Sequence, residues 1–347
     1  MSPLLADPDR WNAWNSFLEA TPDTGFMQSS WWAVFRSHVG YECFTITLKD
    51  NDTIVGGALV GKWSYPTGNC FYYIQDGPVL PSNESAARDV FGAILDNVEQ
   101  HRKAEEETVS HLRIEPRWQH LPGFVCGFRT LSFEDTFTEP RNTLCIDLRP
   151  SEEEILAQMK PKGRYNIRVA QRHGVAVVED NSDEGLADFL RIQRRTSVRQ
   201  EIGGKPAGYY RILLSAFSST QKVSFYFAEY QGRRLATAMV VYFGGRATYF
   251  FGGSLAVHRC VMAPYLLHFE IMRRAKASGC EWYDFWGVAP ENQPEHAWQN
   301  ISVFKRKFGG HEVSLVPTLD YVYDATAYDQ YAETKRKAAE KEAKQYA

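Results

Sequence analysis

The chain has few of the patterns that mark metal-binding, secreted or membrane-spanning proteins. Its six cysteines show no C-x-x-C spacing, so we expect reduced thiols in a cytoplasmic protein. The nine histidines lack the spacing of zinc ligands, which predicts no metal site. No apolar run approaches the roughly 18 residues that a spanning helix needs, and the first residues have neither the basic nor the apolar segment of a signal peptide.

An excess of charge of one sign is also missing, because 39 basic and 42 acidic residues leave a formal net charge of −3. Any contact with a polyanion must therefore be local. What the chain has in quantity is apolar and aromatic residues, at 44% and 14% of 347 residues. This composition predicts a folded protein that is long enough for two domains, each with its own core.

The most informative stretch is Tyr-Phe-Phe-Gly-Gly-Ser at 249–254, which predicts a strand that ends at the two glycines. Residues 222–230 and 235–243 are predicted strands before it. From Pro264 onward, apolar residues recur at three- and four-residue steps, which predicts a helix. Residues 282–286 then form a short apolar run that predicts another strand, bounded by Gly287.

The same order of elements is predicted earlier in the chain, about 170–180 residues before. The predicted elements are strands at 44–49, 53–63, 70–75 and 109–114, with a helix at 84–103 between the last two. A repeat of this length indicates two related domains. Residues 124–133 and 142–148 are predicted strands that lead from the first domain to the second.

Two sequence motifs carry a resemblance to a known family. Trp-Tyr-Asp-Phe-Trp-Gly at 282–287 and Phe-Lys-Arg-Lys-Phe-Gly-Gly at 304–310, together with the repeat, resemble the FemABX family of peptidoglycan interpeptide-bridge aminoacyltransferases. The resemblance covers roughly residues 25–320. It implies an α/β (α+β) fold of two GNAT-like domains with mixed sheets flanked by helices. Domain 1 would comprise 1–145 plus 318–347 and bind the acceptor precursor, and domain 2 would comprise 146–317 and bind the aminoacyl-tRNA.

The resemblance also implies the substrates. The chain would move an amino acid from aminoacyl-tRNA to the stem peptide of a UDP-linked or lipid-linked muramyl peptide, with peripheral membrane contact as an option and no DNA partner. No cofactor is expected. GNAT enzymes hold the pyrophosphate of CoA on the amides of a glycine-rich turn, whereas residues 259–264 contain no glycine.

Lys305 is the best candidate for a catalytic residue. It follows an apolar approach that ends at Phe304 and begins a Lys-Arg-Lys run, and the family resemblance assigns such a lysine to the tRNA end or to the developing charge. Phe304 and Tyr249 are candidate substrate contacts. Asp284 could act as a base, although a carboxylate in this position can equally bond the backbone.

A basic segment at 160–172 has five cationic residues and no acidic one. Arg164, Arg168 and Arg172 are four residues apart, so they lie on one stripe of a predicted helix. The stripe could hold phosphates, and the resemblance links its arginines to nucleotide phosphate or tRNA. A solvated basic face is the alternative.

Two further candidates lie in the first domain. The resemblance places a basic residue at the end of a Gln-Ser-x-x-Trp helix near the precursor phosphates, and Arg36 occupies that position. Asp76 precedes Gly77-Pro78, where the family commonly has a basic residue. Asp76 could replace a family carboxylate that is found slightly later, but a turn is the alternative.

Two other functions stay open at the level of the sequence. The chain could be a GNAT-type N-acyltransferase on another amine, for example in exopolysaccharide assembly, which would predict dependence on CoA or a carrier protein. It could also bind cell-wall precursors without catalysis, which the departures at Asp76 and Pro81 allow.

Overall fold

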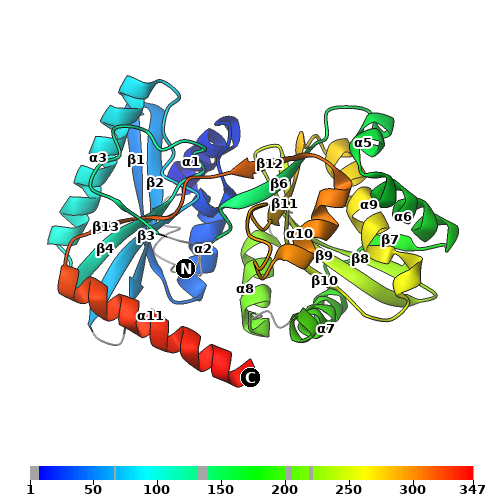
Figure 1. The fold of residues 1–347 in the computed structure, drawn as a ribbon. Helices are drawn as coiled ribbons and strands as arrows, with labels where there is room; N and C mark the ends of the chain where they lie inside the picture. The colour runs from blue at the N-terminus through cyan, green and yellow to red at the C-terminus, as the bar shows by residue number, and fades with distance from the viewer. Residues whose placement is uncertain (1–7, 66–67, 132–138, 201–204, 219–221, 347) are drawn as a thin grey trace. The chain divides into compact units, whose positions relative to one another are not determined.

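The computed structural model describes residues 8–65, 68–131, 139–200, 205–218 and 222–346 (Figure 1). The chain divides into two compact units. Unit 1 is Met1–Arg141 with Leu315–Ala347, and unit 2 is Asn142–Ser314. The sequence placed these boundaries after residues 145 and 317, a few residues later.

Unit 1 is built on a six-stranded mixed sheet in the order β1-β2-β3-β4-β13-β5. Strands β1 to β3 are antiparallel, and β4 lies parallel to β3 after the crossover helix α3. The elements of unit 1 are α1 (Pro8–Ala20), η2 (Phe26–Gln28), α2 (Ser30–His38), β1 (Glu42–Asp50), β2 (Thr53–Ser64), β3 (Asn69–Gln75), α3 (Glu84–Lys103), β4 (Thr108–Glu115), β5 (Arg129–Thr130), β13 (Leu319–Val322) and α11 (Ala325–Tyr346).

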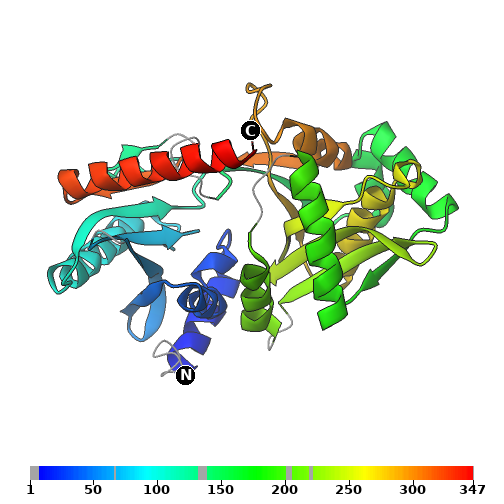
Figure 2. The ribbon, with the colours of Figure 1, turned by 90° about the horizontal axis from the view of Figure 1, so that it is seen from below.

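Helices cover both faces of the unit 1 sheet because β3 is apolar on both sides. Tyr72 and Ile74 belong to the core beneath α3, whereas the alternate residues Phe71 and Tyr73 pack with Tyr331 of α11. Figure 2, where α11 is red, shows this helix running along the sheet. A strand that is buried on both faces reads as a continuous apolar run rather than an alternating one.

The C-terminal segment returns to unit 1 and is held there by a buried ion pair. Arg113 of β4 is 2% exposed, and its guanidinium donates to both carboxylate oxygens of Asp320 in β13, at 2.8 and 2.7 Å. The hydroxyl of Tyr331 accepts a bond from Arg113 at 2.9 Å, and the hydroxyl of Tyr328 donates to Asp320 at 2.9 Å. The two charges are therefore paired and hydrogen-bonded, as burial of charge requires.

Unit 2 repeats the plan of unit 1 in a seven-stranded sheet of order β12-β6-β11-β10-β9-β8-β7. Strands β8 to β10 are antiparallel, and β11 is parallel to β10 after helix α9. The elements are β6 (Asn142–Asp147), α5 (Glu152–Gln158), α6 (Pro161–Arg172), β7 (Ala176–Glu179), α7 (Asp183–Gln200), α8 (Ala207–Ser218), β8 (Val223–Tyr230), β9 (Arg233–Phe243), β10 (Arg246–Ser254), η3 (Arg259–Val261), α9 (Ala263–Ala277), β11 (Trp282–Gly287), α10 (Gln299–Lys305), η4 (Arg306–Phe308) and β12 (His311–Ser314). The predicted repeat of three strands, a helix and a strand is confirmed, and in both units the last strand is parallel to the third.

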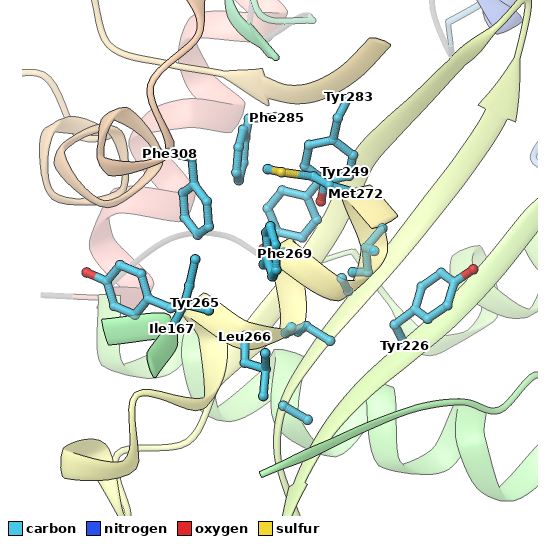
Figure 3. Packing of buried hydrophobic residues seen from close by; sticks show 14 of the residues in the cluster. Ile167, Tyr226, Tyr249, Tyr265, Leu266, Phe269, Met272, Tyr283, Phe285 and Phe308 are labelled. Carbon is cyan, nitrogen blue, oxygen red and sulfur yellow. The ribbon is translucent and has the colours of Figure 1, made fainter. Parts of the chain in front are cut away.

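The main core of unit 2 lies between its sheet and α9. Figure 3 shows the aromatic side chains of β10, β11 and η4 gathered around this helix, with Tyr249 close to Met272 and Tyr283. On the other face of the sheet, Phe189 of α7 packs against Phe225 of β8 with ring centroids 4.7 Å apart. The sheet is thus covered on both faces, and Tyr249 lies on the α9 side.

Local sequence signals explain several helix starts. Ser29 caps α2 by accepting the backbone N–H of Trp32, and Ser151 forms a reciprocal capping box with Glu154 at α5. The predicted strand at 124–133 is wrong over most of the length that the structure describes, because only Arg129–Thr130 pairs with β13. Phe124, Val125 and Phe128 instead pack from a loop onto the unit 1 core, so their apolar character reflects burial rather than strand pairing.

Candidate active site

Unit 2 contains a cavity of about 670 Å³ between the start of β9, the end of β10, the end of α7, the start of α9 and one face of α10. Its wall includes Tyr249, His268 and Phe304, and none of the described residues that line it is acidic. Gly252 is needed on this wall, because a Cβ there would lie 2.5 Å from the carbonyl oxygen of Thr237 and 2.5 Å from the ring of Tyr249. The cavity therefore has an aromatic wall, and at Gly252 the backbone packs directly against this wall.

Tyr249 and His268 form an uncharged part of this wall. Their ring centroids are 4.6 Å apart in an edge-to-face arrangement, and Nδ1 of His268 lies 2.8 Å from the hydroxyl of Tyr283. Burial, together with the nearby charge of Lys305, lowers the pKa of His268 to about 3, and burial raises the pKa of Tyr249. Both side chains are therefore neutral at physiological pH.

Phe304 joins the wall from α10. Its ring centroid lies 5.0 Å from Tyr265 and 5.6 Å from His268. The structure thus brings together Tyr249 and Phe304, which the sequence proposed, with His268, which the sequence placed only on the apolar face of a helix. A histidine among apolar helix positions was the one signal that could have pointed to it.

Lys305 is adjacent to this wall and is 5% exposed. Its ammonium donates to the carbonyl oxygen of Gly287 at 2.6 Å and lies 5.7 Å from the ring centroid of Tyr249. Burial lowers the pKa of Lys305 to about 7, against the opposing effect of the Asp284 charge. A lysine that changes charge near neutral pH is suited to proton transfer or to charge stabilisation that depends on pH.

Asp284 is fully buried in β11, where its carboxylate holds a strand bulge. One oxygen accepts the hydroxyl of Thr143 and, at 2.8 Å, the backbone N–H of Trp286, while the other lies 3.4 Å from the guanidinium of Arg246. Trp286 has a φ of 60°, and the β11–β6 register shifts between Asp284 and Gly287. These contacts favour the backbone-bonding alternative over a base.

The basic segment forms α6 as predicted, but its arginines differ in their contacts. The guanidinium of Arg164 donates to the carbonyl oxygens of Ala157, at 3.1 Å, and Met159, so it closes the C-terminal end of α5. Arg168 and Arg172 are exposed, and the guanidinium of Arg172 lies 5.9 Å from the ring centroid of Tyr165. The face that is open to a ligand is therefore smaller than the full stripe.

Arg36 lies at the end of α2 in unit 1, where Gln75 and two aromatic rings hold it. Its Nε and Nη2 donate to Oε1 of Gln75 at 2.9 and 2.5 Å, and its guanidinium carbon is 4.0 Å from the ring centroid of Tyr41. A pocket next to it, lined also by Trp32 and Tyr73, has only about 10 Å³ of space. The guanidinium is thus fixed in place, but this pocket alone could not contain a nucleotide.

Asp76 follows Gln75 in a left-handed backbone conformation with a φ of 53°. It is buried, with one oxygen 3.6 Å from the guanidinium of Arg117. Gly25 approaches so closely that a Cβ there would lie 2.0 Å from the Asp76 carboxylate. Asp76 is therefore packed into unit 1, and it directly follows Gln75, which binds the guanidinium of Arg36.

The turn before α9 offers few amides to a pyrophosphate. The N–H groups of Val261, Met262 and Tyr265 already donate to backbone carbonyls, and Pro264 has no N–H. Within the described residues, no group of three or more His, Cys, Asp and Glu side chains could hold a metal ion. No helix in that part of the chain combines the length and apolar character of a bilayer-spanning helix.

Comparison with known proteins gives a consistent family match. The model of the FemAB family matches residues 11–121, 125–234 and 228–336. A UDP-N-acetylmuramoylpentapeptide-lysine N(6)-alanyltransferase of Weissella viridescens is 23% identical over 322 residues, which cover 88% of this chain and 90% of the relative. A lipid II:glycine glycyltransferase of Staphylococcus epidermidis is 20% identical, with 90% and 92% covered.

Solved structures show the same fold. A crystal structure of FemX superposes with a TM-score of 0.83 at 16% identity and covers 93% of this chain and 98% of that chain. A tandem GNAT protein from the clavulanic acid pathway superposes with a TM-score of 0.50 at 12% identity, with 91% and 95% covered. The two GNAT-like domains predicted from the sequence are therefore confirmed as a fold.

Proposed function

Because the chain belongs to the FemAB family, we propose that it transfers an amino acid from aminoacyl-tRNA to the stem peptide of a muramyl-peptide precursor. Two relatives that match nearly the whole chain are an alanyltransferase that acts on a UDP-linked muramoylpentapeptide and a glycyltransferase that acts on lipid II, which supports the class of reaction and of acceptor. The observation that carries the proposal is the unit 2 cavity, where Tyr249 and Phe304 form an aromatic wall beside the buried ammonium of Lys305.

In this proposal the cavity of unit 2 receives the aminoacyl ester. The acceptor amine attacks the ester carbonyl, the new C–N bond forms, and the C–O bond to the ribose breaks. The amine loses a proton and the ribose oxygen gains one. The ester is already activated, so positioning supplies much of the rate.

Lys305 is proposed to stabilise the negative charge that develops on the carbonyl oxygen. A protonated ammonium at a water-poor site is effective in this role, because it needs no reorganisation during the reaction. Its bond to the Gly287 carbonyl fixes the ammonium at 2.6 Å from a backbone oxygen. Tyr249 and Phe304 are proposed to contact the aminoacyl end.

Unit 1 is proposed to bind the acceptor precursor, with Arg36 directed to its phosphates. This proposal is supported by the contacts with Gln75 and Tyr41, which hold the guanidinium of Arg36 in one place. A planar cation in a fixed position binds phosphate with good geometry. Asp76 is retained as a weaker candidate for orienting the acceptor amine. No cofactor is proposed, because the turn before α9 has no glycine at 259–264 and the N–H groups of Val261 and Met262 already donate to backbone carbonyls.

One experiment tests the proposal. The protein is incubated with a pool of charged tRNAs and, separately, with a UDP-linked and a lipid-linked muramyl pentapeptide, and the products are analysed by mass spectrometry. We expect one precursor to gain the mass of an amino acid, and ribonuclease treatment of the donor pool to abolish the gain. Transfer from acyl-CoA instead would support an N-acyltransferase, and precursor binding without transfer would support a non-catalytic binding protein.

A further inference from the structure

Two arginines lie at one end of the unit 2 cavity. Arg199, in the last turn of α7, donates to the carbonyl oxygen of Ser254 at 2.8 Å, and Arg259 begins η3. Both line the cavity and both are exposed. Burial of part of the side chain and the charge of Arg259 lower the pKa of Arg199.

Among the described residues these two cations have no carboxylate partner, in contrast to Arg191, Arg234 and Arg273 of the same unit. The two guanidinium groups repel each other, and the described part of the cavity wall has no acidic residue. An anion is therefore favoured between them. Arginine binds phosphate through paired N–H groups, with a geometry that fits its planar guanidinium.

A row of three aromatic rings continues from this end of the cavity. His258, next to Arg259, has its ring centroid 5.5 Å from that of Tyr230, and Tyr230 is 6.3 Å from His173. The rings come from three different elements: the loop after β10, the end of β8 and the end of α6. His173 and His258 are exposed and Tyr230 is half-buried.

The row ends at the open part of α6. Arg172 precedes His173, and it lies against Tyr165, which is 59% exposed. Tyr165 therefore presents an open aromatic ring beside a cation. Cations interleaved with rings are instead the pattern of surfaces that bind unpaired nucleic acid, where phosphates contact the cations and bases stack on the rings.

We propose that the row His258–Tyr230–His173, with Arg199 and Arg259, binds the unpaired nucleotides that precede the 3′ end of the donor RNA. The inference rests on the proposed function, and it adds a path along unit 2 by which the RNA enters the cavity. The phosphate nearest the cavity contacts the arginine pair, and successive bases lie against the rings. A single adenosine, as in CoA, would cover only part of a row of three rings.

The test uses the full chain and RNA without an amino acid. Binding of a fluorescent RNA hairpin with a four-nucleotide 3′ overhang is compared with binding of the blunt hairpin of the same stem. We expect the wild-type protein to prefer the overhang. Tyr230→Leu, which keeps apolar packing, and His258→Ala should each weaken overhang binding by about 5- to 100-fold, the range for loss of one stacked base, with little effect on the blunt hairpin.

The arginine pair is tested through the salt dependence. Arg199→Ala with Arg259→Ala should reduce the slope of log affinity against log salt by about 1.4, the value for two contacts to a single strand. Arg195→Ala is the matched control, because Arg195 is exposed on the same helix and does not line the cavity. It should leave the overhang preference and nearly all of the slope unchanged.

Two results would overturn the inference. One is a wild-type preference for the overhang that the Tyr230, His258 and arginine variants retain. The other is calorimetric binding of CoA that is lost in the arginine double variant, without any overhang preference. Because the RNA carries no aminoacyl group and no acceptor is present, this assay can succeed where transfer fails. If wild-type transfer occurs and the variants match it at limiting RNA, only the inference fails.

Discussion

Lys305 shows how one residue links burial to chemistry. An ammonium loses hydration when it is buried. At Lys305 this loss is offset in part by a hydrogen bond to the Gly287 carbonyl and by the negative charge of Asp284. The buried charge of Lys305 therefore lowers the free energy of unfolding, while it can interact strongly with charge that develops during the reaction. Removal of this charge should consequently have opposite effects on activity and on stability.

For activity, Lys305→Ala should lower the single-turnover transfer rate by roughly two to three decades, the range for loss of one oxyanion donor. Precursor affinity should change little, because the proposed effect belongs to the transition state. Lys307→Ala is the control, since its ammonium lies close by and donates to the hydroxyl of Tyr265 at 3.3 Å. A folded Lys305→Ala protein with wild-type turnover would remove Lys305 from the mechanism.

The pH dependence gives a second test of the charge on Lys305. The protonated form falls as the pH rises through about 7, so the rate that depends on this cation should decline above that pH. Lys305→Arg retains its charge over this range and should give a lower rate without the decline. Single-turnover transfer from pH 6 to pH 9 measures this; a decline that persists in the arginine variant must come from another group.

For stability, burial of Lys305 should cost most at low pH. The folded-state pKa of about 7 lies below the value near 10.4 for an unfolded lysine. The penalty is therefore fully present below about pH 7 and disappears as the pH rises toward 10. Lys305→Met should raise the free energy of unfolding by about 1–4 kcal/mol at pH 6 and by clearly less at pH 10. Urea unfolding at the two values checks this, and an equal gain at both would contradict it.

At the scale of elements, α6 shows that a stripe of like residues can have divided roles. Arg164 is turned back to the open carbonyls of α5, whereas Arg168 is exposed. Gly163 explains why α6 lies close to η4, because a Cβ there would be 2.3 Å from the carbonyl oxygen of Lys307. The start of α6 therefore packs on the turn that directly follows Lys305.

Arg164 and Arg168 should differ in how their substitution affects RNA binding and stability. Arg168→Ala should reduce the salt slope of RNA binding by roughly 0.7–0.9, the value for one phosphate contact, with no change in melting temperature. Arg164→Ala should lower the melting temperature and change the slope less. Arg211→Ala, an exposed arginine of α8, is the control. A slope that responds only to Arg164 would reverse these assignments.

The sequence predicted the helices and strands well where the hydrophobic periodicity agreed with the glycine and proline residues that end an element. The repeated three strands, helix and strand carried clear signals, including the run 282–287, and they led to the correct fold. The sequence could not predict that Arg199 and Arg259 line the same cavity, because α7 and η3 are far apart in the chain and come together only in the folded unit. His268 carried only a weak signal, since a histidine on an apolar helix face is usually structural. Residues 124–133 were assigned to a strand because apolar content alone does not distinguish a paired strand from a packed loop.

At the scale of the whole molecule, each unit is a mixed sheet covered on both faces, and unit 1 is completed by the last part of the chain. Arg113 and Asp320 are 207 positions apart and form one buried pair. The sequence shows an arginine on a predicted strand and an aspartate near a polar tail, with no pattern that connects them. Long-range pairing of this kind depends on the sheet order, which local periodicity does not encode.

Removing one partner of this pair should be severe. Asp320→Ala should lower the free energy of unfolding by about 3–5 kcal/mol, because it leaves the Arg113 charge buried without its carboxylate. Replacing both, as Arg113→Met with Asp320→Leu, should recover much of that loss. Asp329→Ala, an exposed position on α11, is the control. Urea unfolding followed by fluorescence provides the measurement, and a mild effect of Asp320→Ala would show that the pair adds little.

The return of β13 and α11 to unit 1 has a consequence for synthesis on the ribosome. Residues 142–314 form a complete unit by themselves, so they can fold as soon as they emerge. Unit 1 begins first but is finished last, because β13 lies beside β4 and pairs with it only after residue 319 is made. Until then the edge of β4, with Arg113, has no partner strand. A nascent chain of this protein therefore carries an open sheet edge for most of its translation, and a chaperone that shields strand edges would act on unit 1 rather than on unit 2.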